Sequence, residues 1–162
     1  MKSTFKKEKI LKEKQKKISK VIKRIEKIES FCSDSITRQN IDNLRYYYTL
    51  CEIVYKDLLV KYIEIKTKKK LDSNAKNKQK TINVTQVYSV FKFFGFDFKE
   101  DFLKDIFSSN NTDSARRLRN KITHSMDIEN NDEFNLKSTK YIKEMKEFLA
   151  KFKEGPNNGI FN

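Results

Sequence analysis

The chain has one histidine, His124, within the segment LRNKITHS at residues 118–125. Arg119 precedes it by five positions, and Asn120 follows that arginine directly. Histidine is the side chain best suited to transfer a proton near neutral pH. Arginine binds phosphate and stabilises its growing negative charge, and asparagine can orient an imidazole or bond a ribose hydroxyl. Together they suit cleavage of an RNA phosphodiester by its own 2′-hydroxyl, a reaction that needs no metal.

One imidazole cannot serve as separate general base and general acid. A two-fold homodimer would supply two imidazoles and bring two sets of arginines together. We therefore expect a homodimer with a composite site, no cofactor and no metal, since the His and Cys content is too low for a zinc site. The alternative interpretation is that His124 is a chance surface histidine.

A helical wheel at about 100° per residue predicts how residues 114–126 are arranged. Ala115, Leu118 and Ile122 fall on one face, which we expect to be buried. The side chains expected on the opposite face are Arg116, Arg117, Asn120 and His124, with Arg119 on the flank. Arg116, Arg117 and Lys121 are candidate RNA contacts. Other polar residues near the histidine, which could bond substrate, orient the ring or end the helix, are Thr123, Ser125, Asp127 and Glu129.

The net charge of +14 on 162 residues favours polyanionic partners, with nucleic acid and anionic membrane surfaces first. A lysine-rich genome explains the same charge without any partner, because 30 of the 36 cations are lysines. No run approaches the roughly 20 apolar residues that span a bilayer, and no signal-peptide pattern is present. Cys32 and Cys51 read as reduced thiols. We expect a cytoplasmic protein without a membrane partner.

Residues 1–27 carry twelve basic and three acidic side chains and are expected to be helical. An apolar stripe at spacings of three and four supports a helix there. The residues of this stripe are Ile18, Val21, Ile22, Ile25 and Ile28, with Phe31 or Cys32 continuing it. Towards the N-terminus the stripe thins out. Ser33, Asp34 and Ser35 are candidate caps for the next helix.

A second helix is expected from about residue 36 to 66. A heptad seam runs along it, which is more typical of a bundle core than of a binding surface. The seam residues are Leu44, Tyr48, Cys51, Tyr55, Leu58, Tyr62 and Ile65. The lysine-rich segment 66–84 is expected to be a loop or helix end. Lys68, Lys69 and Lys70 within it could contact phosphates, although a solvated loop explains them equally well.

Further short helices are expected near 85–94 and 98–108, with a turn at Gly95, and another after a cap at Asp113 or Ser114. Five phenylalanines, expected to pack at one end of the bundle, are Phe91, Phe94, Phe98, Phe102 and Phe107. The last helix has a core face of Phe134, Tyr141, Met145, Phe148 and Phe152. The low Gly and Pro content excludes most β architectures. We therefore predict an all-α, up-and-down bundle of five or six helices, with one domain over 1–154 and a tail at 155–162.

An all-helical bundle with RNKITH late in the chain resembles the HEPN superfamily, many of whose members are metal-independent endoribonucleases. The family pattern is Arg, four to six residues and then His, often with Asn after the Arg. The resemblance implies a phosphate contact for Arg119, proton transfer for His124 and positioning for Asn120. It also implies dimers in which two motifs face each other. Family members act in toxin–antitoxin pairs, abortive infection and other antiviral defence, or RNA processing.

Two alternatives stay open. The first is a catalytically silent HEPN-like module that binds RNA, a nucleotide or a protein partner, and the second is a structural helical protein that forms a coiled coil through the seam over residues 44–65. For the nuclease, RNA and a second copy are the expected partners, with a cognate antitoxin or a larger defence complex as regulator.

Overall fold

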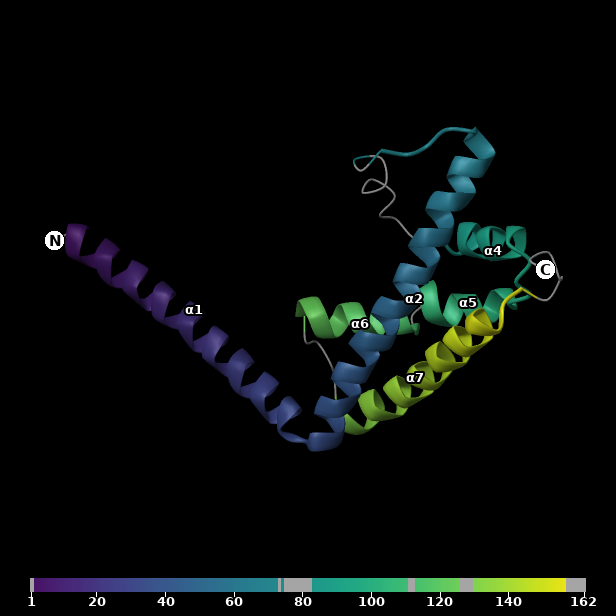
Figure 1. Cartoon of the computed structure of the whole chain (residues 1–162). Coiled ribbons are helices and arrows are strands. Elements are labelled where there is room, and N and C mark those ends of the chain that lie inside the picture. Colours follow the sequence, from purple (N-terminus) through teal and green to yellow (C-terminus); the bar gives the residue numbers. More distant parts are fainter. Residues whose placement is uncertain (1, 73, 75–82, 111–112, 126–129, 157–162) are drawn as a thin grey trace. The chain divides into compact units, whose positions relative to one another are not determined.

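The computed structural model describes residues 2–72, 74, 83–110, 113–125 and 130–156, with side chains from residue 18 onward except that of Ser125. Every regular element in this part of the chain is helical (Figure 1), which confirms the all-α class. The chain divides into two compact units, Met1–Arg38 and Gln39–Asn162. The expected single domain over 1–154 stays a prediction. Residues 73 and 75–82 of the segment 66–84, and residues 157–162 of the expected tail, lie outside the described residues.

Helix α1 spans Lys2–Ser33 in the first unit and ends where the predicted caps Ser33, Asp34 and Ser35 begin. Asp34 then caps the following helix: its Oδ2 accepts hydrogen bonds from the Thr37 N–H at 2.8 Å and the Thr37 hydroxyl at 2.6 Å. Arg38 donates from Nε and Nη2 to the carbonyl of Cys32 at 3.2 and 3.0 Å. Because a capping carboxylate satisfies N–H groups that have no intrahelical partner, the break falls where the sequence predicted it.

Helix α2 spans Ser35–Thr67, and its first half follows the predicted seam. Leu44, Tyr48, Cys51 and Tyr55 are all buried. After Tyr55 the buried position is Leu59 instead of the predicted Leu58, which is half-buried. A straight helix turns once per 3.6 residues and so drifts away from a 3.5-residue repeat. Further along, Tyr62 is half-buried and Ile65 is 53% exposed, so the seam ends before the helix does.

Two short helices follow, α4 (Val84–Phe93) and α5 (Glu100–Phe107), close to the predicted ranges. The expected turn is present, with Gly95 at φ 82°, where glycine has no steric penalty. Of the five phenylalanines expected to pack together, Phe91, Phe98 and Phe107 are buried, and Phe94 and Phe102 are half-buried. The ring of Phe148 on the last helix packs edge-on or tilted against the three buried rings, with centroids 5.0–5.7 Å apart.

Helix α7 (Asn131–Glu154) lies beside α2 and runs in the same direction (Figure 1). The side chains of Asn40 and Asn135 are joined by a hydrogen bond of 2.9 Å, and the Cys51 thiol lies 4.0 Å from the carbonyl of Met145. Four of the predicted core residues of this helix are buried, and Phe152 is half-buried. The buried four are Phe134, Tyr141, Met145 and Phe148. The helix ends where the sequence predicted, at Gly155, which adopts a φ of +90°.

Both cysteines are free, with Cys51 buried and Cys32 half-buried. Burial raises the pKa of the Cys51 thiol to about 12, so that side chain is a small apolar core residue at neutral pH. None of the described helices combines the length and the apolar character that a membrane span requires.

Candidate functional site

Helix α6 (Ala115–Asn120) carries the first half of the RNKITH motif and begins at a serine cap. The Ser114 hydroxyl accepts a hydrogen bond from the N–H of Arg117 at 3.1 Å and donates to the carbonyl of Ser108, just beyond α5. Ser114 is 1% exposed. This one hydroxyl therefore starts α6 and fixes its position against the end of α5.

The second half of the motif forms a π-helical turn, η1 (Lys121–Ser125), directly after α6. The predicted regular helix over 114–126 was therefore correct only for its first half. The predicted buried face is found, with Ala115, Leu118 and Ile122 at 0, 9 and 1% exposed. On the opposite face His124 is exposed, whereas Arg116, Arg117 and Asn120 are half-buried. Single π turns inside helices occur frequently at functional sites.

Arg119 is held in place by two neighbours. Its Nη1 donates to the Asn120 Oδ1 at 3.0 Å, and its guanidinium lies over the ring of Tyr48 on α2, with Cζ 5.4 Å from the ring centroid. A guanidinium over an aromatic face is attracted by the ring quadrupole. The structure thus brings Arg119 and Asn120 together, as predicted, and adds an aromatic platform beneath the arginine.

Tyr48 is buried, and its hydroxyl has no hydrogen-bond partner among the described residues. Burial raises the pKa of the Tyr48 phenol above its usual range, and the Glu52 carboxylate adds to this effect. The guanidinium groups of Arg116 and Arg119 act in the opposite direction without cancelling the shift. The phenol consequently stays protonated and neutral under ordinary conditions, so its ring face is the part that interacts with Arg119.

His124 is exposed, as the helical wheel predicted, and no hydrogen bond or ion pair joins it to another described residue. Asp127 and Glu129, which were candidates to orient the ring, lie outside the described residues, as does the side chain of Ser125. The Thr123 hydroxyl donates to the carbonyl of Arg119 at 2.9 Å. That bond satisfies a carbonyl of the helix backbone, so Thr123 has a structural role that involves no substrate.

The other predicted RNA contacts on this segment fall into two groups. Arg116 is half-buried, and its Nη1 lies 3.5 Å from the carbonyl of Phe107 at the end of α5. Arg117 and Lys121 line a small hollow with Lys137 and Tyr141 of α7. The basic side chains around the motif therefore spread over more than one side of α6 and are not gathered at His124.

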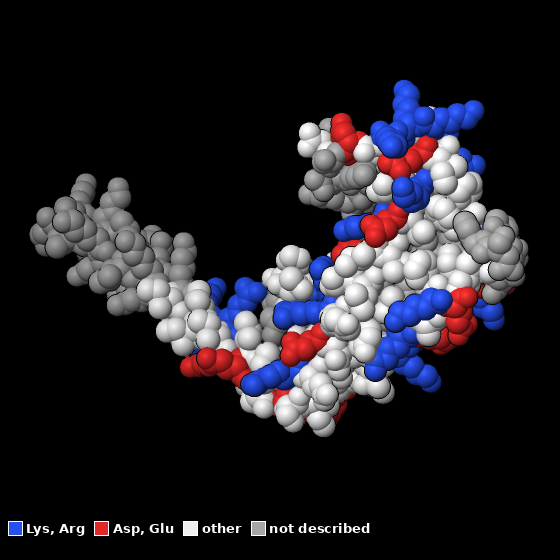
Figure 2. Space-filling view, viewed as in Figure 1, with Lys and Arg blue, Asp and Glu red and all other residues white. Residues whose placement is uncertain are grey.

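Lys68, Lys69 and Lys70 are exposed just past the end of α2, where Figure 2 shows several basic side chains together. Tyr48, the residue of α2 that contacts Arg119, lies 19 residues before Thr67 at the end of the same helix. At 1.5 Å per residue, the three lysines lie about 30 Å from Tyr48 along the helix axis. The structure does not bring them to the motif, so they would form a separate contact region.

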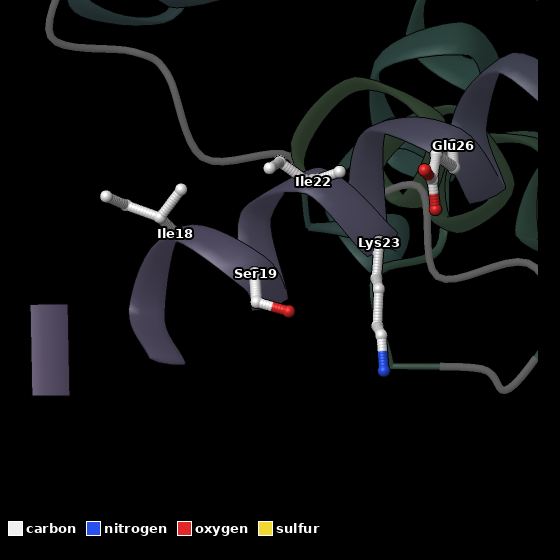
Figure 3. A pocket seen from close by; sticks show the side chains of 5 residues that line it. All are labelled: Ile18, Ser19, Ile22, Lys23 and Glu26. Carbon is white, nitrogen blue, oxygen red and sulfur yellow. The ribbon is translucent and has the colours of Figure 1, made fainter. Parts of the chain in front are cut away.

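Two other features of the described residues do not form a site. Within the described residues, no group of three or more His, Cys, Asp or Glu side chains could hold a metal ion. An open hollow on α1 is lined by Ile18, Ser19, Ile22, Lys23 and Glu26 (Figure 3). Because all five come from one helix, this hollow is a helix surface and does not enclose a substrate.

The sequence did not reveal that Tyr48 belongs to the site. The seam pattern places Tyr48 in the bundle core, 71 positions before Arg119, and nothing local to either residue signals that they meet. Comparisons with protein-family models, with curated proteins and with solved structures gave no match to this chain. The candidate site is therefore defined by its own residues: Arg119, Asn120 and His124, with Tyr48 beneath the arginine.

Proposed function

We propose that the chain is a HEPN-like, metal-independent endoribonuclease. The observation that carries this proposal is an exposed imidazole on η1, five residues after an arginine whose position Asn120 and Tyr48 fix. A pre-positioned guanidinium stabilises charge as it develops on phosphate, without reorganisation during the reaction. The exposed imidazole is accessible to RNA, and histidine is the side-chain type most often used for proton transfer in catalysis.

The reaction that fits these groups is transfer within the RNA backbone. One His124 accepts the proton of the 2′-hydroxyl, whose oxygen attacks the adjacent phosphorus while Arg119 stabilises the phosphoryl oxygens. The bond to the 5′-oxygen breaks, and the His124 of a second copy gives that oxygen its proton. The products are a 2′,3′-cyclic phosphate and a 5′-hydroxyl. We place this reaction in a cytoplasmic toxin or antiviral-defence setting, with an antitoxin or larger complex as regulator.

The test is cleavage of single-stranded RNA by the purified chain in EDTA. Arg119→Ala and His124→Ala are each expected to lower the cleavage rate by about a hundredfold or more, the usual contribution of a general acid–base or charge-stabilising group. Lys143→Ala, which removes an exposed cation from α7, serves as the control and should leave the rate unchanged. Circular dichroism checks that each variant keeps its helices. Full activity of His124→Ala would remove the imidazole from the mechanism.

A second candidate is a catalytically silent module that binds RNA, a nucleotide or a protein through the same segment. The contacts of Arg119 with Asn120 and Tyr48 favour it, because a purely structural arginine makes the same contacts. Retention of RNA on a native gel with no cleavage product after prolonged incubation would favour this candidate over the nuclease.

A further inference from the structure

Helix α1 carries an apolar stripe that the structure leaves exposed. Ile18, Val21, Ile22 and Ile25 are 59, 57, 50 and 49% exposed, and Ile28 is half-buried. Figure 3 shows Ile18 and Ile22 along one side of the helix, with Ser19 and Lys23 along another. Contiguous exposed apolar side chains with a polar rim mark interaction surfaces more often than ordinary surface.

The spacing of the stripe specifies the kind of surface. Positions 18, 21, 25, 28 and 32 follow steps of three and four, which are the a and d positions of a coiled coil. Ile22 falls at the neighbouring e position and widens the apolar face. The positions on the opposite side of the helix are polar: Ser19, Lys20, Lys23, Glu26, Lys27 and Ser30. The pattern therefore matches a helix that packs against another long helix along one seam.

The charged residues beside the seam indicate that the partner helix is α1 of a second copy. In the same register Arg24 is at g and Glu29 is at the e position of the next heptad. In a parallel, in-register coiled coil, a g residue faces the e residue five positions later on the other helix. Arg24 would then face Glu29 of a second copy, and symmetry makes the pair twice. An antiparallel arrangement pairs g with g and e with e, which loses this match.

We propose that α1 is a self-association helix, which pairs in parallel and in register with α1 of another copy of this chain. The seam is centred on residues 18–28, because Leu11 continues the a positions towards the N-terminus but Lys14 interrupts the d positions. β-branched residues at both a and d shift the preference of a parallel coiled coil from two helices towards three or four, so the measured mass decides the number of copies. The proposal uses no residue of the RNKITH motif and holds whether or not the chain cleaves RNA.

The first experiment measures the mass of the full-length chain by sedimentation velocity over a range of concentrations. The unaltered chain should have a mass of two or more times 19.4 kDa. Ile25→Asp places a charge in an a layer and should weaken association by at least about tenfold. Leu136→Asp is the matched control, since Leu136 is 75% exposed on α7 and lies outside the seam. A monomeric unaltered chain, or equal association of the Ile25→Asp variant, overturns the proposal.

Two further sets of variants test the orientation and do not require a disruptive core change. Arg24→Glu and Glu29→Arg should each weaken association several-fold, and the double variant should restore it. In a Cys32→Ser background, Ile25→Cys should form a disulfide-linked dimer on oxidation, while Lys23→Cys, on the outer face, should not. Failure of the double variant to recover, or cross-linking at position 23 in place of 25, contradicts the parallel register.

Discussion

At the scale of single residues, the position of Arg119 depends on a side chain from another helix. Asn120 binds one guanidinium nitrogen, and the ring of Tyr48 lies beneath the guanidinium plane. The Tyr48 hydroxyl, in contrast, is buried with no hydrogen-bond partner among the described residues. A buried polar group without a partner costs free energy, so the ring and the hydroxyl of Tyr48 have opposite effects on the molecule.

This separation predicts different results for two substitutions of Tyr48. Tyr48→Phe keeps the ring and removes the hydroxyl, so the free energy of unfolding should rise by about 1 kcal/mol with unchanged cleavage. Tyr48→Leu removes the platform and should lower the cleavage rate roughly tenfold through misplacement of Arg119. Urea unfolding and RNA cleavage assays measure the two effects, and Tyr46→Phe, at an exposed tyrosine, is the control. Equal loss of cleavage in both Tyr48 variants would assign the role to the hydroxyl.

At the scale of elements, the motif is positioned by the junction between α5 and α6. The Ser114 hydroxyl caps α6 and also donates to the carbonyl of Ser108 beyond α5, and Arg116 approaches the carbonyl of Phe107. These bonds satisfy backbone groups at two helix ends at once. Six residues of α6 form too short a helix to be stable alone, so this junction and the burial of Leu118 and Ile122 hold it in place.

The junction predicts a loss of stability in Ser114→Ala. The variant loses both the cap and the bond to Ser108, and its free energy of unfolding should fall by about 1–2 kcal/mol. Ser109→Ala, at an exposed serine one position beyond Ser108, should change it by less than about 0.5 kcal/mol. Chemical unfolding followed by circular dichroism compares the two. Equal stability of the Ser114 variant and the unaltered chain would show that the cap does not hold α6.

At the scale of the whole molecule, the net charge of +14 is distributed unevenly. Arg117 and Lys121 lie towards α7, and the exposed lysines past α2 lie about 30 Å from Tyr48 along the helix axis. A strand of RNA at His124 would have to extend well beyond the motif to reach those lysines. This distribution of basic side chains therefore predicts a higher affinity for long polyanions than for a short substrate.

Salt dependence of RNA binding tests the contribution of these lysines. A His124→Ala background is used because cleavage is expected to be slow in it. There, the combined change of Lys68, Lys69 and Lys70 to alanine should reduce the slope of log affinity against log salt by about 2, at about 0.7 per contact. The control changes Lys143, Lys146 and Lys153 of α7 to alanine and removes the same net charge. Equal slopes for the two triple variants would show a general charge effect without local contacts.

The sequence by itself determined the helical class and most helix boundaries. The low Gly and Pro content allows few turns, which favours long helices. Helix ends are specified by single residues such as Asp34, Ser114 and Gly155, because a cap acts on backbone groups only a few residues away. The sequence also predicted the exposure of His124, which lies away from the buried face defined by Leu118 and Ile122, although Arg116, Arg117 and Asn120 on the same side are half-buried.

Only the tertiary structure decided what lies next to the motif. Tyr48 meets Arg119 because α2 passes α6, and no periodicity in either segment encodes that contact across 71 residues. The π turn at Lys121–Ser125 and the shift of the seam from Leu58 to Leu59 likewise depend on packing, which moves a helix off an ideal repeat. Local sequence specifies which face of a helix is buried, whereas the packing of several helices together specifies which side chain covers it.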